Sequence, residues 1–410
     1  MTSRASRFLP AILLLLAGMS VSPSLLGKLA GLPSGVGLAA IVPILALSLL
    51  FVRRLPFSVA IVSILWLQMA ALMFIELHHG GSTSFLLTVP TLFGVLVAYL
   101  ALESGLVGVE ELVHAYVVLM IVLLFLAAIS VLLALVGKVH PLPVYGRGTS
   151  GSGGTTVYVV GFTMSNAIID FGNGYFVRPS GLFDEPGQFG IMVTLAILAN
   201  AVVMRRLSYE ILLIVLGLFT VSLGFYVSIF LYLMLWRLRI WGLASVALLL
   251  TVAAVLAVEA QSGEGLIYSQ TVGRVVALFS SESFGGNRFA DSVTGLDLLW
   301  EVGFWGFNAK ELSGYDTSEI AATFFGPFMY FGLLGGVILY AHIFFLGAAG
   351  AWWSQGNFVQ LLHSDSFRVF VVMVVSLYHR SSCLYFLYYL MLLAIYIADR
   401  RRHSPASPLA

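Results

Sequence analysis

Arg178 begins the segment of this chain whose residue types and spacing point most directly to chemistry. A guanidinium group carries a permanent charge, and its planar fork of donors matches the oxygens of a phosphate group. Charged groups beside hydrocarbon cost about 2.5–3.5 kcal/mol each on insertion scales, so a charged cluster kept there suggests a function. We interpret Arg178 as a candidate phosphate ligand; the alternative is an ion pair with Asp184 or Glu185 that only fixes the loop. The segment reads Arg178-Pro179-Ser180-Gly181-Leu182-Phe183-Asp184-Glu185-Pro186-Gly187-Gln188, and a long apolar run follows from Phe189.

Two carboxylates stand directly before Pro186, a residue that suits the first position of a helix. Carboxylates at a helix N-terminus cap it and complement its dipole. We assign that capping role to Asp184. For Glu185 the sequence leaves open a cap, a general base or a carboxylate that binds sugar.

His379 and Arg380 form a second charged position. The apolar run before them has 10 residues, which is about 15 Å of helix and too short to cross a bilayer. Arg380 is therefore expected below the outer surface, where it needs an anionic partner: a lipid-linked pyrophosphate or a carboxylate from a loop. His379 could shuttle a proton, although a single histidine among aromatic residues is more often structural.

Residues 259–320 add further ionisable groups. Arg274 and Arg288 could extend a cationic funnel towards an anionic substrate, or they could be solvated loop charges. Asp316 and Glu319 precede the next apolar run, so one of them is a candidate acid/base residue and a helix cap is the alternative.

Metal and nucleotide cofactors are not expected. His78 and His79 have no evident third ligand, and Cys383 is the only cysteine, so neither a zinc pattern nor a disulfide framework is possible. The chain contains no Walker loop, no dinucleotide fingerprint and no G-x-S-x-G elbow. Any reaction must therefore draw on an activated substrate or a gradient.

The composition predicts an all-α polytopic membrane protein with a single integral membrane domain, residues 1–410. Hydrophobic residues make up 60% of the chain and charged residues 10%, whereas soluble domains carry about 25% charged residues. The net charge of +1 gives no general attraction to nucleic acid.

The first apolar run is read as a retained helix because no cleavage site follows it. Apolar runs predict 12 spans, at 8–26, 33–52, 56–75, 85–102, 112–136, 189–204, 207–223, 225–236, 240–258, 321–349, 369–378 and 383–397.

Basic residues predict the orientation of these spans. With the N-terminus in the cytoplasm, 12 of the 20 Lys and Arg residues fall inside, and both termini are cytoplasmic. Glu103, Glu110 and Glu111 break this pattern, since they share a cytoplasmic connection without a basic neighbour. Two long loops, 137–188 and 259–320, then lie outside; the first contains a flexible glycine-rich stretch at 146–154. In the second, helical spacing of Phe289, Val293, Leu296 and Trp300 predicts a helix on the membrane surface or on a small core of the loop.

The order of these parts resembles the Wzy-type O-antigen and exopolysaccharide polymerases and the related O-antigen ligases. The resemblance covers roughly residues 178–336. It rests on the segment from Arg178 to Pro186 before a helix, a pair of short helices and a long outer loop. That loop holds Asn287-Arg288-Phe289 and Gly303-Phe304-Trp305-Gly306, and it closes on Gly332-Leu333-Leu334-Gly335.

The resemblance implies an integral glycosyltransferase with a multi-helix fold like that of the C-type glycosyltransferases and no metal. The donor would be a glycan on undecaprenyl pyrophosphate, and a hydroxyl of the acceptor glycan would attack the anomeric carbon as the lipid pyrophosphate leaves. Arg178 and Arg288 match arginines of the family, and Arg380 matches a basic residue near the last outer turn. The location implied is the bacterial inner membrane, with the active side periplasmic, and a chain-length regulator is a candidate partner.

The family's ligases carry a histidine near the end of the second loop, and this loop has none. The nearest ionisable groups are Asp316 and Glu319. This favours a polymerase over a ligase-like transferase. A transporter or flippase for a lipid-linked or anionic solute is a third reading, and the lack of an internal repeat speaks against it.

Overall fold

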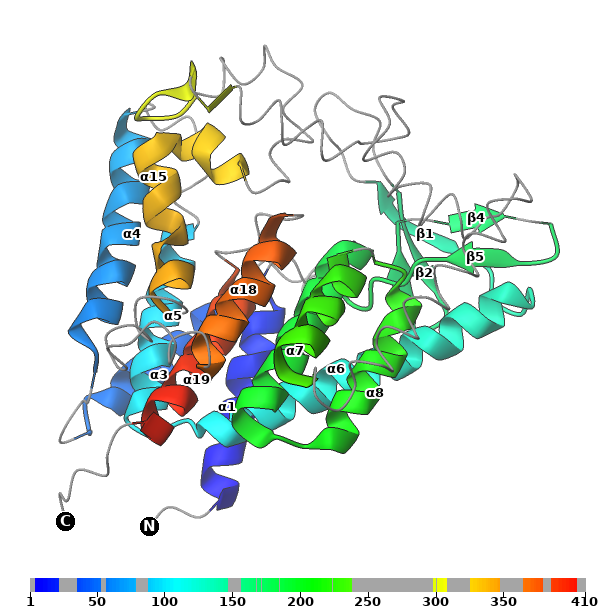
Figure 1. Cartoon of the computed structure of the whole chain (residues 1–410), viewed down its shortest axis with the longest axis horizontal. Helices are drawn as coiled ribbons and strands as arrows, with labels where there is room; N and C mark the ends of the chain where they lie inside the picture. Colours follow the sequence, from blue (N-terminus) through cyan, green and yellow to red (C-terminus); the bar gives the residue numbers. More distant parts are fainter. Residues whose placement is uncertain are drawn as a thin grey trace.

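The computed structural model describes residues 4–21, 35–52, 57–78, 88–146, 156–166, 168–170, 172–183, 185–222, 224–237, 298–299, 301–307, 325–346, 364–378 and 385–403. Within these ranges the protein is a bundle of helices with two small sheets at one end (Figure 1).

The helices follow the predicted apolar runs in order. Eleven of the 12 runs contain a helix in the described residues, and the run 240–258 lies outside them. The helices are α1 (Arg4–Met19), α3 (Val36–Leu49), α4 (Val59–His78), α5 (Thr88–Glu103), α6 (Val109–Leu135), α7 (Pro186–Ala199), the π-helix η2 (Asn200–Met204), α8 (Leu207–Gly217), the 3₁₀ turn η3 (Leu218–Thr220), an unlabelled helix Gly224–Arg237, α15 (Gly326–Phe344), α18 (Asp365–Tyr378) and α19 (Phe386–His403).

Five short strands in the first long loop make the all-α prediction incomplete. β1 (Leu142–Gly146), β2 (Thr156–Val160) and β3 (Thr163–Ser165) form an antiparallel sheet, and β4 (Ile168–Asp170) pairs with β5 (Tyr175–Val177). β2 reads Thr-Val-Tyr-Val-Val, and such β-branched and aromatic residues favour strands. Most of the glycine-rich stretch, 147–154, lies outside the described residues.

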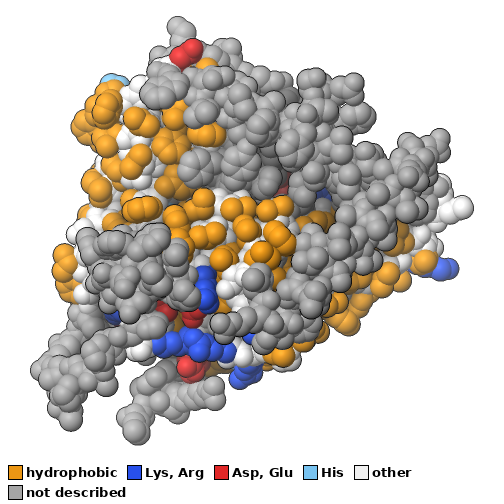
Figure 2. Space-filling model, in the orientation of Figure 1, with side chains coloured by type: hydrophobic (Ala, Val, Ile, Leu, Met, Phe, Trp, Pro, Cys, Tyr) orange, Lys and Arg blue, Asp and Glu red, His pale blue; other side chains and the backbone are white. Residues whose placement is uncertain are grey.

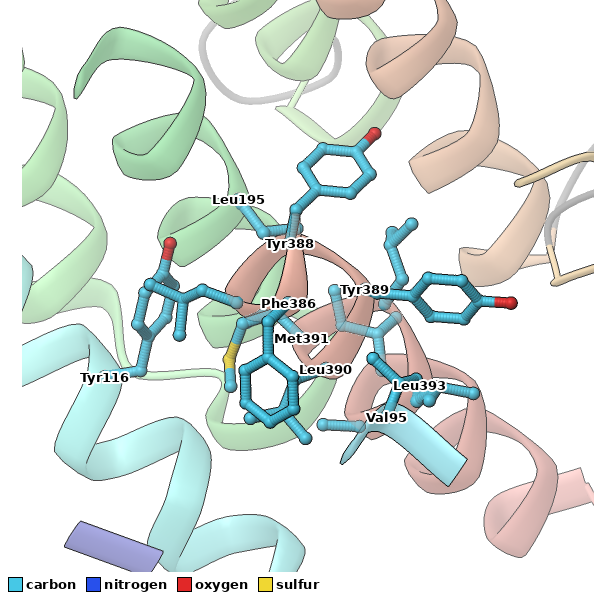
Figure 3. Packing of buried hydrophobic residues seen from close by; sticks show 14 of the residues in the cluster. Val95, Tyr116, Leu195, Phe386, Tyr388, Tyr389, Leu390, Met391 and Leu393 are labelled. Atoms are coloured by element: carbon cyan, nitrogen blue, oxygen red, sulfur yellow. The ribbon is translucent and has the colours of Figure 1, made fainter. Parts of the chain in front are cut away.

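Helix α19 forms the centre of the bundle. It contacts α1, α5, α6, α7 and α18, and its residues from Phe386 to Ala394 are all buried. Figure 3 shows Phe386, Met391 and Leu393 of this helix packed among side chains of α5, α6 and α7. A helix that is apolar on every side is typical of the interior of a large bundle.

The face of the bundle that Figure 2 shows carries many apolar side chains. Two helices, Val109–Leu135 and Pro186–Met204, are long and apolar enough to cross a membrane, and shorter apolar helical stretches of 10–17 residues occur elsewhere in the described part, such as Val59–Ile75 and Phe331–Phe344. Large exposed apolar surface on a helical protein marks contact with a partner or a membrane. These features are typical of a membrane-associated protein. The exposed apolar side chains include Leu13, Ile44, Leu47, Trp66, Phe74, Phe125, Leu132, Val215 and Phe344.

Charged side chains gather at the end of the bundle where α1 begins and α19 ends (Figures 1 and 2). Arg400 donates two hydrogen bonds to the Glu103 carboxylate, at 2.6 and 2.7 Å, and Arg401 contacts the same carboxylate at 3.8 Å. Glu103 belongs to a predicted cytoplasmic connection that has no basic neighbour in sequence. Its charge is neutralised by Arg400 and Arg401, which lie far away in the sequence. We call this end the basic end, defined by Arg205, Arg206, Arg237, Arg368, Arg400, Arg401 and Arg402.

Replacing Glu103 by glutamine is expected to lower the free energy of unfolding by about 2–3 kcal/mol, since a hydrogen bond to a charged group contributes about 1.5–3 kcal/mol. The Glu103 side chain is only 2% exposed, so water cannot replace its arginine partners. Thermal unfolding of purified protein in detergent measures the effect. The control is Glu110→Gln, an exposed carboxylate at the same end; equal losses for both variants would contradict the prediction.

The end of the second long loop docks between α4 and α15. Trp305 lies 5.2 Å, ring to ring, from both Phe74 and His78 of α4. The backbone of residues 303–307 meets α15 where Gly332 interrupts the helix with φ 69°. The amide of Leu333 donates to the Gly303 carbonyl at 3.0 Å, and the amide of Phe307 donates to the Met329 carbonyl at 2.8 Å. The loop therefore satisfies backbone groups that the break leaves open.

The predicted close packing between helices at Gly332, Gly335 and Gly336 is found at Gly335, which faces α4; the Phe328 ring that covers Gly336 belongs to α15 itself. A Cβ at Gly335 would stand 2.7 Å from Ile75 of α4, and one at Gly336 would stand 2.3 Å from Phe328. Gly332 instead accommodates the loop, because a Cβ there would stand 2.1 Å from the Phe304 carbonyl oxygen.

The predicted surface helix is described only at its C-terminal part. Phe289, Val293, Leu296 and Trp300 lie outside the described residues. Leu298 and Val302 are buried and pack against Met329 of α15. This part of the loop therefore packs on α15, an arrangement that neither prediction specified, and the helix at 289–300 stays a prediction.

Candidate functional site

Arg178 lies where the small sheets meet the bundle. It follows β5 directly, and its carbonyl accepts a hydrogen bond from the Ser165 hydroxyl of β3 at 2.7 Å. Two residues later, the Ser180 amide donates to the Met164 carbonyl at 2.7 Å, and the Met164 amide donates to the Gly181 carbonyl at 3.0 Å. The backbone of the arginine is thus bonded to the sheet that the sequence did not predict.

The Arg178 side chain is held from the other side by the bundle. Its Nε donates to the Val221 carbonyl at 3.1 Å, and the side chain is half-buried. This bond uses one of the five guanidinium donors and sets the orientation of the planar fork. A fixed guanidinium needs no reordering when an anion binds, which is what a phosphate ligand requires.

Val221 occupies an unusual backbone conformation. Its φ and ψ are 48° and 43°, in the left-handed region that β-branched residues avoid. The Val221 amide donates to the Leu218 carbonyl, and the Thr220 hydroxyl donates to the Gly217 carbonyl at 2.8 Å. Such conformations are strained by about 1–3 kcal/mol and cluster at functional sites. Here the strained residue presents its carbonyl to Arg178.

Close packing of α7 holds this turn in place. A Cβ at Gly190 would stand 2.9 Å from the Ser222 hydroxyl and 3.0 Å from Phe225, and one at Gly217 would overlap the Phe225 ring. The Ser222 hydroxyl accepts from the Phe225 amide at 3.4 Å, which caps the helix Gly224–Arg237. The pair of short helices thus brings its connecting turn to the N-terminal end of α7.

Glu185 occupies the N-cap position of α7, with Pro186 at N1 as predicted. Its backbone is extended, with φ −146° and ψ 150°, and its side chain makes no capping hydrogen bond. The Phe189 amide donates to the Glu185 carbonyl at 3.2 Å. The backbone of Glu185 therefore starts the helix, while its half-buried carboxylate has no part in the cap.

Ser180 is a buried polar residue that the sequence analysis did not single out. It is 0% exposed, and its hydroxyl has no hydrogen-bond partner among the described residues. Buried hydroxyls are nearly always bonded, so an orphan one two residues after Arg178 needs an explanation. A serine between Pro179 and Gly181 is a common loop residue, so its sequence carried no signal.

Gly181 shapes the segment between Arg178 and α7. Its φ is 61°, and its amide donates to the Thr163 hydroxyl at 3.1 Å. A Cβ at this position would stand 3.1 Å from the Phe189 ring, which stacks on Phe183. This turn therefore suits glycine, and it returns the chain from the sheet to α7.

The structure describes two of the predicted site residues, Arg178 and Glu185, at the two ends of this turn. Asp184, Arg274, Arg288, Asp316, Glu319, His379 and Arg380 lie outside the described residues, so their place relative to Arg178 stays a prediction. No group of three metal-binding side chains occurs among the residues that were placed. Searches of the sequence against protein-family models and against curated proteins give no match.

Proposed function

We propose that this chain is an integral glycosyltransferase of the bacterial inner membrane that polymerises undecaprenyl-pyrophosphate-linked repeat units into O-antigen or exopolysaccharide. In this proposal about 12 helices cross the membrane, both termini are cytoplasmic, and the Arg178 end faces the periplasm. The observation that carries it is the fixed, half-buried guanidinium of Arg178 near the N-terminal end of α7.

The distance between the two charged regions supports this orientation. Arg205 and Arg206 of the basic end follow the helix Pro186–Met204, and Arg178 precedes it. Its 19 residues span about 28 Å at 1.5 Å per residue, close to the thickness of a bilayer core. The positive-inside rule assigns the arginine-rich end to the cytoplasm. Arg178 then lies near the opposite surface, where a lipid-linked glycan would be presented.

The proposed reaction forms one bond and breaks another. The acceptor hydroxyl oxygen bonds to the anomeric carbon of the donor, and the bond from that carbon to the pyrophosphate oxygen breaks. The electron pair leaves with the lipid pyrophosphate, whose charge Arg178 would neutralise, and Arg288 and Arg380 are proposed to join it. A carboxylate would take the hydroxyl proton; Glu185, Asp316 and Glu319 are the candidates.

A transporter is less well supported by the described part of the chain. Transporters place charged binding groups near the middle of the membrane between related halves. Most of the described Asp, Glu, Lys and Arg residues stand in loops or in the first or last turns of helices; Asp170 ends β4, and Asp399 lies one residue before the last turn of α19. A catalytic site at one surface fits this distribution better than a path through the bundle.

The glycan products of a deletion strain test the proposed function. Loss of a polymerase is expected to leave single repeat units on the lipid carrier and on the final acceptor, and the intact gene should restore long chains. A ligase-like transferase would instead leave long chains on the lipid that are not transferred. Long chains on the final acceptor in the deletion strain would overturn the assignment.

A further inference from the structure

A cavity of about 510 Å³ opens at the basic end of the bundle, on the side of the protein opposite Arg178. Among the described residues its walls come from three parts of the chain: Phe8 of α1, Glu110, Glu111 and His114 of α6, and Val203 and Met204 of η2 with Arg206 just before α8. The proposed transferase reaction uses none of these residues.

One wall of the cavity is acidic. Glu110 and Glu111 lie in the first turn of α6, and Glu110 is exposed. The Glu111 carboxylate folds back over Gly108, the N-cap residue, since a Cβ there would meet it at 1.9 Å. A glutamate at this third helical position typically serves the cap. Glu110 is therefore the carboxylate that the cavity can use.

Another part of the cavity wall carries the Arg206 guanidinium, whose position is set by aromatic contacts. Arg206 lies over the Tyr209 ring, with its central carbon 5.4 Å from the ring centre, and donates to the Tyr209 hydroxyl at 3.3 Å. Tyr209 in turn stacks on His114 at 5.9 Å and approaches its Nε2 at 3.2 Å. The described residues form no ion pair between Glu110 and Arg206, so opposite charges share one cavity without neutralising each other directly.

The remaining wall is apolar, formed by Phe8, Val203 and Met204. The Phe8 ring lies 6.5 Å from the His114 ring. This wall borders the exposed apolar side chains of α1, among them Leu9, which is 61% exposed. The cavity thus offers an anion, a cation and a path to apolar surface, at the end of the bundle where the arginines gather.

We infer that this cavity binds a phosphoethanolamine group, presented by phosphatidylethanolamine of the surrounding membrane. Its ammonium would donate to the Glu110 carboxylate, its phosphate would accept from Arg206, and the glycerol and acyl chains would lie along Phe8 and Met204. A choline headgroup has no N–H to donate, and a glycerol headgroup has no cation for the carboxylate. The inference is independent of the proposed transferase function.

Binding of defined lipids to the purified full-length chain tests the inference. Native mass spectrometry or thermal stabilisation in detergent compares dioleoyl phosphatidylethanolamine with the phosphatidylcholine and phosphatidylglycerol of the same acyl chains. Loss of one charge-assisted hydrogen bond corresponds to about tenfold in affinity, so we expect the ethanolamine lipid to bind at least about tenfold more tightly than the other two. Equal binding of all three lipids would overturn the inference.

Substitutions in the cavity test whether the ethanolamine lipid binds there. Glu110→Gln and Arg206→Gln are each expected to weaken binding of the ethanolamine lipid about tenfold. The matched control is Arg205→Gln, the neighbouring arginine, whose exposed side chain contacts Asp365 at 3.3 Å instead of the cavity. Unchanged binding in both cavity variants, or an equal loss in the control, would place the lipid elsewhere.

A soluble ester tests whether the phosphoethanolamine group comes from a membrane lipid or from a soluble compound. Glycerophosphoethanolamine has the same ammonium and phosphate but no acyl chains. We expect it to bind far more weakly than the lipid, because it cannot cover the apolar wall. Equal affinity of the two compounds would overturn the membrane lipid as the source.

Discussion

Replacement of Arg178 by alanine is expected to lower the rate of polymer formation about 10²–10³-fold, the loss that follows removal of one fixed donor from a site that stabilises developing charge. In the proposed reaction the negative charge on the pyrophosphate grows as its bond to the sugar breaks. The bond to Val221 already orients the guanidinium. Because the charge that it faces grows along the reaction, Arg178 stabilises the transition state more than the ground state. Glycan chain length in a deletion strain carrying the variant measures the effect, with membrane levels and thermal unfolding as checks on folding.

Two further variants show whether orientation or charge alone accounts for this effect. Arg178→Lys keeps the positive charge but loses the planar fork and the Nε–H that bonds to Val221, so an activity well below that of the native chain is expected. Arg205→Ala removes an arginine that is 62% exposed at the other end of the bundle, and it should leave chain length unchanged. Long glycan chains from a well-folded Arg178→Ala protein would disprove the role of Arg178.

The position of Arg178 before a helix could be predicted from local sequence, because its determinants are local. Pro186 starts the helix, and the apolar run from Phe189 continues it. What holds Arg178 could not be predicted in the same way. Its partner, Val221, lies 43 residues further along the chain, and a strained valine has no signature in sequence.

The sheets escaped prediction for a physical reason. Strands of three to five residues carry too few alternating positions for a period of two to stand out. Their edges are completed by distant segments, as at Met164 and Gly181. The acidic connection near Glu103 is similar, since its arginine partner is 297 residues away. Helices are visible in sequence because their hydrogen bonds are local, whereas these contacts are set by the tertiary fold.

Gly332 shows the limit of a structural prediction that rests on glycine content alone. A glycine-rich run in an apolar helix predicts close helix packing, and Gly335 packs in that way against Ile75 of α4. Gly332 differs because its φ of 69° ends one helical segment and admits the backbone of the docked loop. The motifs at 303–306 and 332–335 are notable in sequence only for their order along the chain. In the structure they are in contact, because the Leu333 amide donates a hydrogen bond to the Gly303 carbonyl.

Gly332→Ala is expected to destabilise the protein by more than about 3 kcal/mol, because two penalties combine at this residue. The Gly332 backbone, with φ 69° and ψ −179°, lies in a region that is essentially restricted to glycine, where a residue with a Cβ is strained by about 1–3 kcal/mol. The added Cβ would also stand 2.1 Å from the Phe304 carbonyl oxygen, so the loop must move and the Leu333 and Phe307 amides lose their bonds to Gly303 and Met329. Thermal unfolding in detergent measures the loss of stability.

Gly303→Ala is the matched control for this prediction. Gly303 also has a positive φ, 65°, but a Cβ there would meet no atom of the described residues within 4 Å. It should therefore show only the backbone penalty of about 1–2 kcal/mol. The difference between the two variants isolates the contact of the loop with α15. Equal destabilisation by both substitutions would mean that the docked loop contributes nothing at Gly332, and that this glycine serves the backbone conformation alone.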